Sequence, residues 1–168
     1  MTDREGMALK ERIHEFARIA RQLTAADRSA LWILDHRNHA LWTVIPNLEG
    51  SLIDLRIAIG QGYVGLVFET GEPFNIPFDL YDDPNATVIQ QSDQRIGYRT
   101  CSLLCTPIVN THQQVTGVIQ VINKRGKGHF LSYDPAHWPK PPDYFKASFD
   151  AKDQQCLMEL GSQIAIAI

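Results

Sequence analysis

The sequence lacks a long apolar run, since no stretch approaches the roughly 18 apolar residues that a helix needs to cross a bilayer. It also lacks an export signal, because its start, MTDREGMALKER, is charged where a signal peptide is apolar. A basic run is missing too, and a net charge of −3 makes the chain a poor binder of nucleic acid. We therefore expect a cytoplasmic protein that has neither a membrane nor a nucleic acid as its partner.

Cysteine is scarce and cannot be fully paired, because the chain has only three. Without an export signal, reduced thiols are the expected state. The six histidines show no spacing that matches a zinc site. A GxSxG elbow, a Walker loop and a GxGxxG turn are all missing from the sequence. These absences predict a domain with no metal, no cofactor and no catalytic activity of its own.

The residues that are present describe an ordinary globular domain. The chain has 168 residues, of which 44% are hydrophobic and 21% charged, enough for one domain with a sizeable core. Apolar periodicity predicts helices at 3–26 and 149–168, a helical segment within 60–71 that Gly71 ends, a short helix from Pro84, and strands at 29–35, 40–45, 53–59, 101–109 and 114–123. A short extended piece precedes Pro77, and 125–148 is irregular. Strands grouped together, with helices at both ends, indicate an α+β fold with an antiparallel sheet.

Two features of the terminal helices bear on assembly. Apolar residues in the first helix follow heptad spacing, at Leu9, Ile13, Phe16, Ala20 and Leu23. This pattern fits either a helix that packs on a partner helix or one that lies on its own domain. The last helix has no stop signal before Ile168, so we expect it to continue into a further domain.

Four stretches together resemble a GAF domain, the small-ligand sensor module of phosphodiesterases, cyclases and bacterial signalling proteins. They are IAIGQGYVGLVFETGEPFNIP, GYRTCSLLCTPI, GVIQVINK and FDAKD. The resemblance implies a single domain over 1–168, whose six-stranded antiparallel sheet has the terminal helices on one face and a ligand pocket on the other. The sheet and pocket would occupy 29–123. Such domains often sit upstream of a catalytic output and dimerise through their terminal helices.

The most similar subset binds cyclic nucleotides and carries Asn-Lys followed, after a variable stretch, by Phe-x-x-x-Asp-Glu. The chain has the same motif at Asn123, Lys124, Phe149 and Asp153, with Gln154 in place of the glutamate. The resemblance assigns a structural role to these four residues. Lys124 and Asp153 would form a partly buried ion pair that ties the last helix to the sheet, and Phe149 would lie in the core.

The resemblance also implies the residues that bind ligand. Backbone amides around Ile76, Asn85 and Ala86 would meet a phosphate at a helix start. The purine would be read by side chains at Asp93, Ile96, Thr100 and Gln120. Ile96 and Ala30 stand where the family usually has hydroxyls, while Arg95 and Arg99 read as solvated surface residues.

Two other functions known for this fold, bilin binding and methionine-sulfoxide reduction, match the sequence less well. Bilin binding needs a cysteine followed by histidine, which the chain lacks, and Cys101 and Cys105 have no activating base for a methionine-sulfoxide reductase. The ligand alternatives are a cyclic nucleotide, another more apolar molecule, or none. We expect a regulatory sensing domain of a larger cytoplasmic signalling protein that binds cyclic AMP or cyclic GMP and forms a homodimer through its terminal helices. The alternative is a ligand-free dimerisation and signal-relay module.

Overall fold

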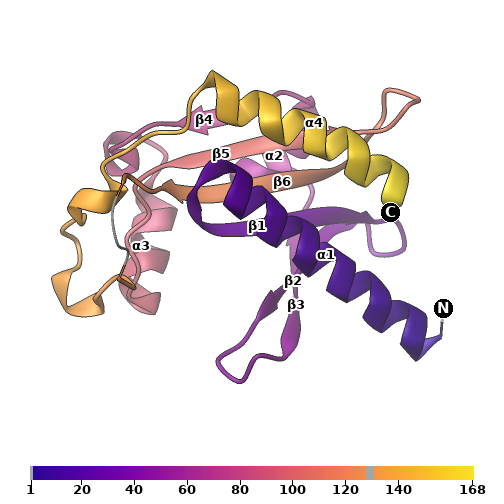
Figure 1. Ribbon diagram of the computed structural model, residues 1–168, viewed down its shortest axis with the longest axis horizontal. Helices are drawn as coiled ribbons and strands as arrows, with labels where there is room; N and C mark the ends of the chain where they lie inside the picture. The colour runs from indigo at the N-terminus through magenta and orange to yellow at the C-terminus, as the bar shows by residue number, and fades with distance from the viewer. Residues whose placement is uncertain (1, 128–130) are drawn as a thin grey trace.

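Six strands form one antiparallel sheet in the order β3-β2-β1-β6-β5-β4 in the computed structural model, which describes residues 2–127 and 131–168 (Figure 1). The strands are β1 (Ala26–Asp35), β2 (Ala40–Pro46), β3 (Leu52–Ala58), β4 (Phe74–Ile76), β5 (Leu103–Val109) and β6 (Val115–Lys124). The α+β class and the antiparallel sheet predicted from the sequence are confirmed. Pro107 is tolerated in β5 because the short β4 pairs only with Leu103–Cys105, which leaves that side of the proline without a strand neighbour.

Four α-helices accompany the sheet: α1 (Asp3–Thr24), α2 (Gly62–Thr70), α3 (Thr87–Ile96) and α4 (Ala151–Ala167). Short 3₁₀ turns lie at Leu80–Asp82, Pro135–His137 and Asp143–Phe145. Among the residues that the structure describes, no helix combines the length and the apolar character that a bilayer span requires.

The helix ends follow local chemistry, with one correction. Gly71 ends α2 in the left-handed region at φ 70°, as its position predicts. The helix predicted from Pro84 instead begins at Thr87. The Asp83 side chain accepts a hydrogen bond from the Asn85 amide, and its carbonyl accepts one from Ala86, so these residues form a turn before the helix.

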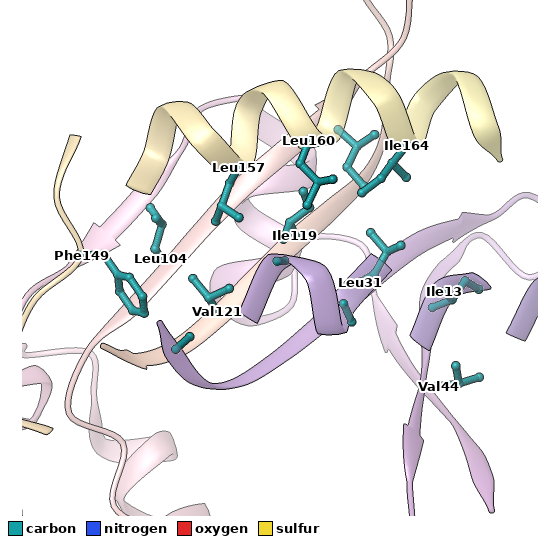
Figure 2. Packing of buried hydrophobic residues seen from close by; sticks show 14 residues of the cluster. Ile13, Leu31, Val44, Leu104, Ile119, Val121, Phe149, Leu157, Leu160 and Ile164 are labelled. Atoms are coloured by element: carbon teal, nitrogen blue, oxygen red, sulfur yellow. The ribbon is translucent and has the colours of Figure 1, made fainter. Parts of the chain in front are cut away.

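The larger core lies between the sheet and the two terminal helices. Ile13 from α1 and Leu157, Leu160 and Ile164 from α4 pack on Leu31, Ile119 and other residues of the sheet face (Figure 2). Four of the five residues of the heptad seam therefore pack on the core of their own domain. Ile13 and Ala20 are fully buried, Leu9 and Phe16 are partly buried against the same core, and Leu23 at the end of the seam is exposed.

The predicted helix-to-sheet residues meet at the end of β6. Lys124 Nζ lies 2.9 Å from Asp153 Oδ1, and it also donates to the Thr24 carbonyl at 2.8 Å. Phe149 is buried just before α4, which begins at Ala151 rather than at 149. One lysine therefore joins the ends of β6 and α1 to the start of α4.

Candidate functional site

A cavity of about 340 Å³ opens on the sheet face opposite the terminal helices. Its floor comes from neighbouring strands, at Arg28, Trp32, Leu103, Gln120 and Ile122. The register explains this set, because Arg28 lies opposite Ile122, and Ile122 lies opposite Leu103 on the next strand. Directly opposed residues of antiparallel strands share a face, so alternate positions of β1 and β6 point into the cavity.

The roof consists of two helices and the segment after α3. The first turn of α2 contributes Gly62, Tyr63 and Val64, and α3 contributes Ile89, Ser92, Asp93 and Ile96. Tyr98 and Thr100 close the wall between α3 and β5. The lining is therefore mostly apolar and aromatic with a few polar groups, which is the usual character of a small-molecule site.

Asp93 is the only carboxylate among the lining residues, and its oxygens are already occupied. It accepts hydrogen bonds from the Tyr81 hydroxyl at 2.7 Å, the Thr100 amide at 2.7 Å and the Thr100 hydroxyl at 2.9 Å. Burial raises the pKa of this carboxyl above its ordinary value, while the bonds from Thr100 and Tyr81 oppose the rise. Asp93 therefore holds the wall of the cavity together.

Four polar side chains of the lining, Arg28, Gln61, Ser92 and Gln120, remain available to a ligand. Trp32 donates to the side-chain oxygen of Gln120 at 3.0 Å, and the Ala58 amide donates to the side-chain oxygen of Gln61 at 3.0 Å, while no described residue accepts from the side-chain nitrogen of either glutamine. Within 2–127 and 131–168, the Ser92 hydroxyl likewise has no hydrogen bond and Arg28 has no ion pair. The Arg28 guanidinium instead lies 3.6 Å from the centre of the Tyr98 ring. The cavity thus presents one cation, two side-chain amide donors and one hydroxyl.

Asn123 secures the segment behind the cavity. Its side-chain oxygen accepts from the Cys101 amide at 2.6 Å and from Ser102 at 3.2 Å, while its nitrogen donates to the Tyr98 hydroxyl and the Arg99 carbonyl, both at 2.8 Å. All four bonds reach the chain between α3 and β5. The residue lies at φ 62°, in the left-handed region that asparagine tolerates better than most residues.

The predicted ligand residues divide into two groups. Asp93, Ile96, Thr100 and Gln120 line the cavity together. Ile76, Asn85 and Ala86 are outside its lining: Ile76 and Ala86 are buried in the core, and Asn85 is exposed. Ile96 lies at the rim with 57% of its surface exposed.

The environments of two arginines differ from what the sequence predicted. Arg99, expected to be solvated, is only 3% exposed and forms a two-pronged pair with Asp79 at 2.8 and 2.7 Å. Arg28 was missed as a site residue. Strand alternation with Trp32, four residues later, could have placed it on the cavity face.

The thiols and the metal-binding residue types form no reactive centre in the described part of the chain. Cys101 and Cys105 are fully buried, and burial raises the pKa of Cys101 to about 12 and raises that of Cys105 as well. Both are therefore thiols rather than thiolates at neutral pH. Residues 2–127 and 131–168 contain no cluster of three or more His, Cys, Asp or Glu suited to a metal ion.

Comparison with known proteins identifies a family and several relatives of this chain. A model of the GAF domain family matches residues 8–168. The chain is 38% identical over 96 residues to the dual 3′,5′-cyclic-AMP and -GMP phosphodiesterase 11A of Takifugu rubripes. That match covers 57% of the chain and only 10% of the phosphodiesterase, so the chain spans about a tenth of its relative's length.

Solved structures share the fold at low sequence identity. The GAF domain of a phosphoenolpyruvate-protein phosphotransferase from Coxiella burnetii superposes with a TM-score of 0.61 at 16% identity, over 94% of this chain and 80% of that one. A free methionine-R-sulfoxide reductase from Thermoplasma acidophilum gives 0.57 at 15% identity, over 94% and 89%. The fold therefore occurs both as a domain of a larger phosphotransferase and as a methionine-R-sulfoxide reductase.

Proposed function

Because the chain belongs to the GAF domain family, we propose that it is a regulatory domain whose cavity under α2 and α3 binds a cyclic nucleotide, cyclic AMP or cyclic GMP. The observation that carries the proposal is which charged group of the cavity lacks a partner in the described part of the protein. Its one carboxylate, Asp93, is occupied by protein donors, whereas its one cation, Arg28, has no ion pair within the described residues. A ligand with one negative charge and a flat apolar body suits these walls.

The phosphate of such a ligand would lie against Arg28 and the first turn of α2. A guanidinium forms strong charge-assisted hydrogen bonds with phosphate oxygens, and a helix start adds partial positive charge from unpaired amides. We therefore assign the phosphate to this wall rather than to Ile76, Asn85 and Ala86, which are outside the cavity lining.

The base would lie between the apolar floor and α3. Trp32, Leu103 and Ile122 offer a flat apolar surface below it, and Ile89 lies above. The Gln120 amide nitrogen can donate to a ring nitrogen or carbonyl, and Ser92 can donate or accept. Asp93 and Thr100 would set the shape of the site, and Ile96 would shield its rim.

Ligand binding would order the segment that includes α3, residues ~78–97, and bias how the terminal helices pack in the parent protein. A ligand can shift such an equilibrium only by its differential affinity for the two states. We place the domain in a cytoplasmic signalling protein, with homodimerisation through α1 and α4.

A second candidate is a ligand-free dimerisation module, favoured by one observation. Large apolar side chains are exposed on both terminal helices, at Met7, Leu23 and Ile166. Changing Met7, Leu23 and Ile166 to Ala should weaken a concentration-dependent dimer if this function is correct, because these side chains are exposed and none of them is part of the buried core.

A thermal-shift titration separates the two candidates. With 1 mM cyclic nucleotide and a dissociation constant near 10 μM, binding adds about 2.7 kcal/mol and raises the melting temperature by roughly 5–10 °C. Arg28→Gln should lower the affinity by about tenfold to a hundredfold, since a hydrogen bond to a charged group contributes about 1.5–3 kcal/mol. Arg37→Gln, an exposed arginine in the β1–β2 turn, is the matched control. No shift with either nucleotide at millimolar concentration would refute cyclic-nucleotide sensing.

A further inference from the structure

The irregular segment before α4 lies against the roof of the cavity. We refer to residues 131–148 as the excursion; Figure 1 shows it running beside α3. Among the contacts that join the two parts, three lead toward α3 and the segment around it. Trp138 Nε1 donates to the Tyr81 hydroxyl at 3.0 Å, and Arg99 Nε donates to the Pro139 carbonyl at 2.8 Å. Pro135 packs on Gly97 so closely that a Cβ at 97 would lie 2.8 Å from the Pro135 Cβ.

The first contact continues to the wall of the ligand cavity. The Tyr81 hydroxyl accepts from Trp138 and donates to Asp93 Oδ2 at 2.7 Å. The same oxygen accepts from the Thr100 amide at 2.7 Å. Asp93 and Thr100 line the cavity, whereas Trp138 and Tyr81 lie outside its described lining. A chain of hydrogen bonds therefore runs from the excursion to the ligand site.

A buried ion pair supports this series of hydrogen bonds from its other side. The Arg99 guanidinium lies 3.4 Å from the centre of the Tyr81 ring and pairs with Asp79. Its position fixes the Tyr81 ring, while Trp138 fixes the Tyr81 hydroxyl. The excursion contributes two members of this network, the Trp138 indole and the Pro139 carbonyl, so its docking bears directly on where Asp93 is held.

We propose that Trp138 is a positioning residue for the ligand cavity, acting through the Tyr81 hydroxyl to hold Asp93 on Thr100. The excursion is then a strap across the roof rather than an independent loop. Its effect on ligand affinity rests on the proposed function, but the positioning of Thr100 does not. Since coupling between two sites is reciprocal, ligand in the cavity would also slow hydrogen exchange in the excursion.

The first test needs no ligand. Amide hydrogen exchange is followed residue by residue by NMR in the wild type and in Trp138→Phe, which keeps an aromatic ring but removes the indole N–H donor together with part of the ring volume. The expected result is exchange at the Thr100 amide about fivefold faster, the equivalent of one ordinary hydrogen bond. Trp42→Phe is the control, because Trp42 lies on β2 away from the cavity lining and should leave Thr100 unchanged. Unchanged exchange at Thr100 in Trp138→Phe would overturn the proposal.

A double-mutant cycle separates positioning from general packing. Tyr81→Phe removes the hydroxyl that links Trp138 to Asp93. Adding Trp138→Phe to it should therefore have little further effect on hydrogen exchange at the Thr100 amide. Fully additive effects would contradict a relay through Tyr81.

The second test measures affinity for cyclic AMP and cyclic GMP by calorimetry. Trp138→Phe should weaken binding about fivefold and Trp42→Phe should not. If the wild type binds but Trp138→Phe binds equally well, the role in the ligand site is refuted. If the wild type binds neither nucleotide, the proposed function fails, and the exchange experiment still decides whether Trp138 positions the cavity wall.

Discussion

Replacing Lys124 by Met tests whether the Asn-Lys motif acts through the fold. The substitution keeps an unbranched side chain that can cover the same apolar surface and removes only the ammonium group. That group pairs with Asp153 at 2.9 Å and donates to the Thr24 carbonyl at 2.8 Å. It therefore stabilises the end of α1 and the start of α4 at the same time.

The size of the effect follows from burial and from the partners that remain. Breaking a buried ion pair costs about 3–5 kcal/mol when the surviving charge has no other contacts. Here the side chains of Lys124 and Asp153 are 23% and 9% exposed, and Asp153 keeps its hydrogen bond from the Asp150 amide. Water and the helix start both lower the penalty. We expect the free energy of unfolding to fall by about 2–3 kcal/mol and the melting temperature by roughly 5–10 °C.

Urea unfolding followed by circular dichroism measures this change, with Lys146→Met as the matched control. Lys146 pairs with Asp143 at 3.1 Å, but the two side chains are 46% and 97% exposed. Exposed pairs of this kind contribute little, so the control should lose less than about 0.5 kcal/mol.

Ligand affinity provides the second readout. Lys124 is absent from the described lining of the cavity, so the folded variant should bind cyclic nucleotide as the wild type does. Equal stability of Lys124→Met and Lys146→Met would refute the assignment of Lys124 to the fold. A lost affinity with unchanged stability would point instead to direct contact with ligand.

Three further outcomes are expected. Gly97→Ala should cost about 1–3 kcal/mol in urea unfolding, because residue 97 lies at φ 76° and its new Cβ would meet Pro135; a cost below 0.5 kcal/mol, a level typical of neutral surface changes, would contradict this. In the native protein only the Cys156 thiol should react with Ellman's reagent, since the other two are buried; release of a second equivalent without denaturant would show that the core opens. Burial raises the pKa of Asp93 above 3.8, so the folded state binds this proton more tightly than the unfolded state. The stabilisation from that proton is complete below the unfolded pKa and is lost as pH rises through the folded pKa. Unfolding free energies at several pH values should therefore show the wild type losing stability relative to Asp93→Asn just above pH 3.8, and a constant difference would contradict the shift.

Local patterns predicted the elements well where the cause is local. Gly71 ends a helix because glycine tolerates a positive φ, and this needs no distant partner. The alternation in IDLRIAI correctly predicted β3, but not its surroundings. Ile53 and Leu55 are 41% and 39% exposed, because β3 is an edge strand of the sheet and, within the described residues, has a strand neighbour on one side only.

The candidate site was predictable only in part. Sequence likeness to known domains assigned Asp93, Thr100 and Gln120 to one ligand site, and all three line the cavity. It did not reveal whether their polar groups are free, because the partners of Asp93 include Tyr81, twelve positions away. It also misread Arg99, whose charge is buried only because Asp79 folds back to pair with it.

The sequence by itself therefore determined the order and type of the elements, the sheet-forming segments and the family. These depend on periodicity, capping and turn chemistry within a few residues of each other. The tertiary structure alone decided which charge of the cavity stays unpaired, that Arg28 lies over Tyr98, and that Trp138 reaches the network around Asp93. The reason is physical: hydrogen bonding and burial depend on which groups meet, and these groups come from segments that lie far apart in the chain.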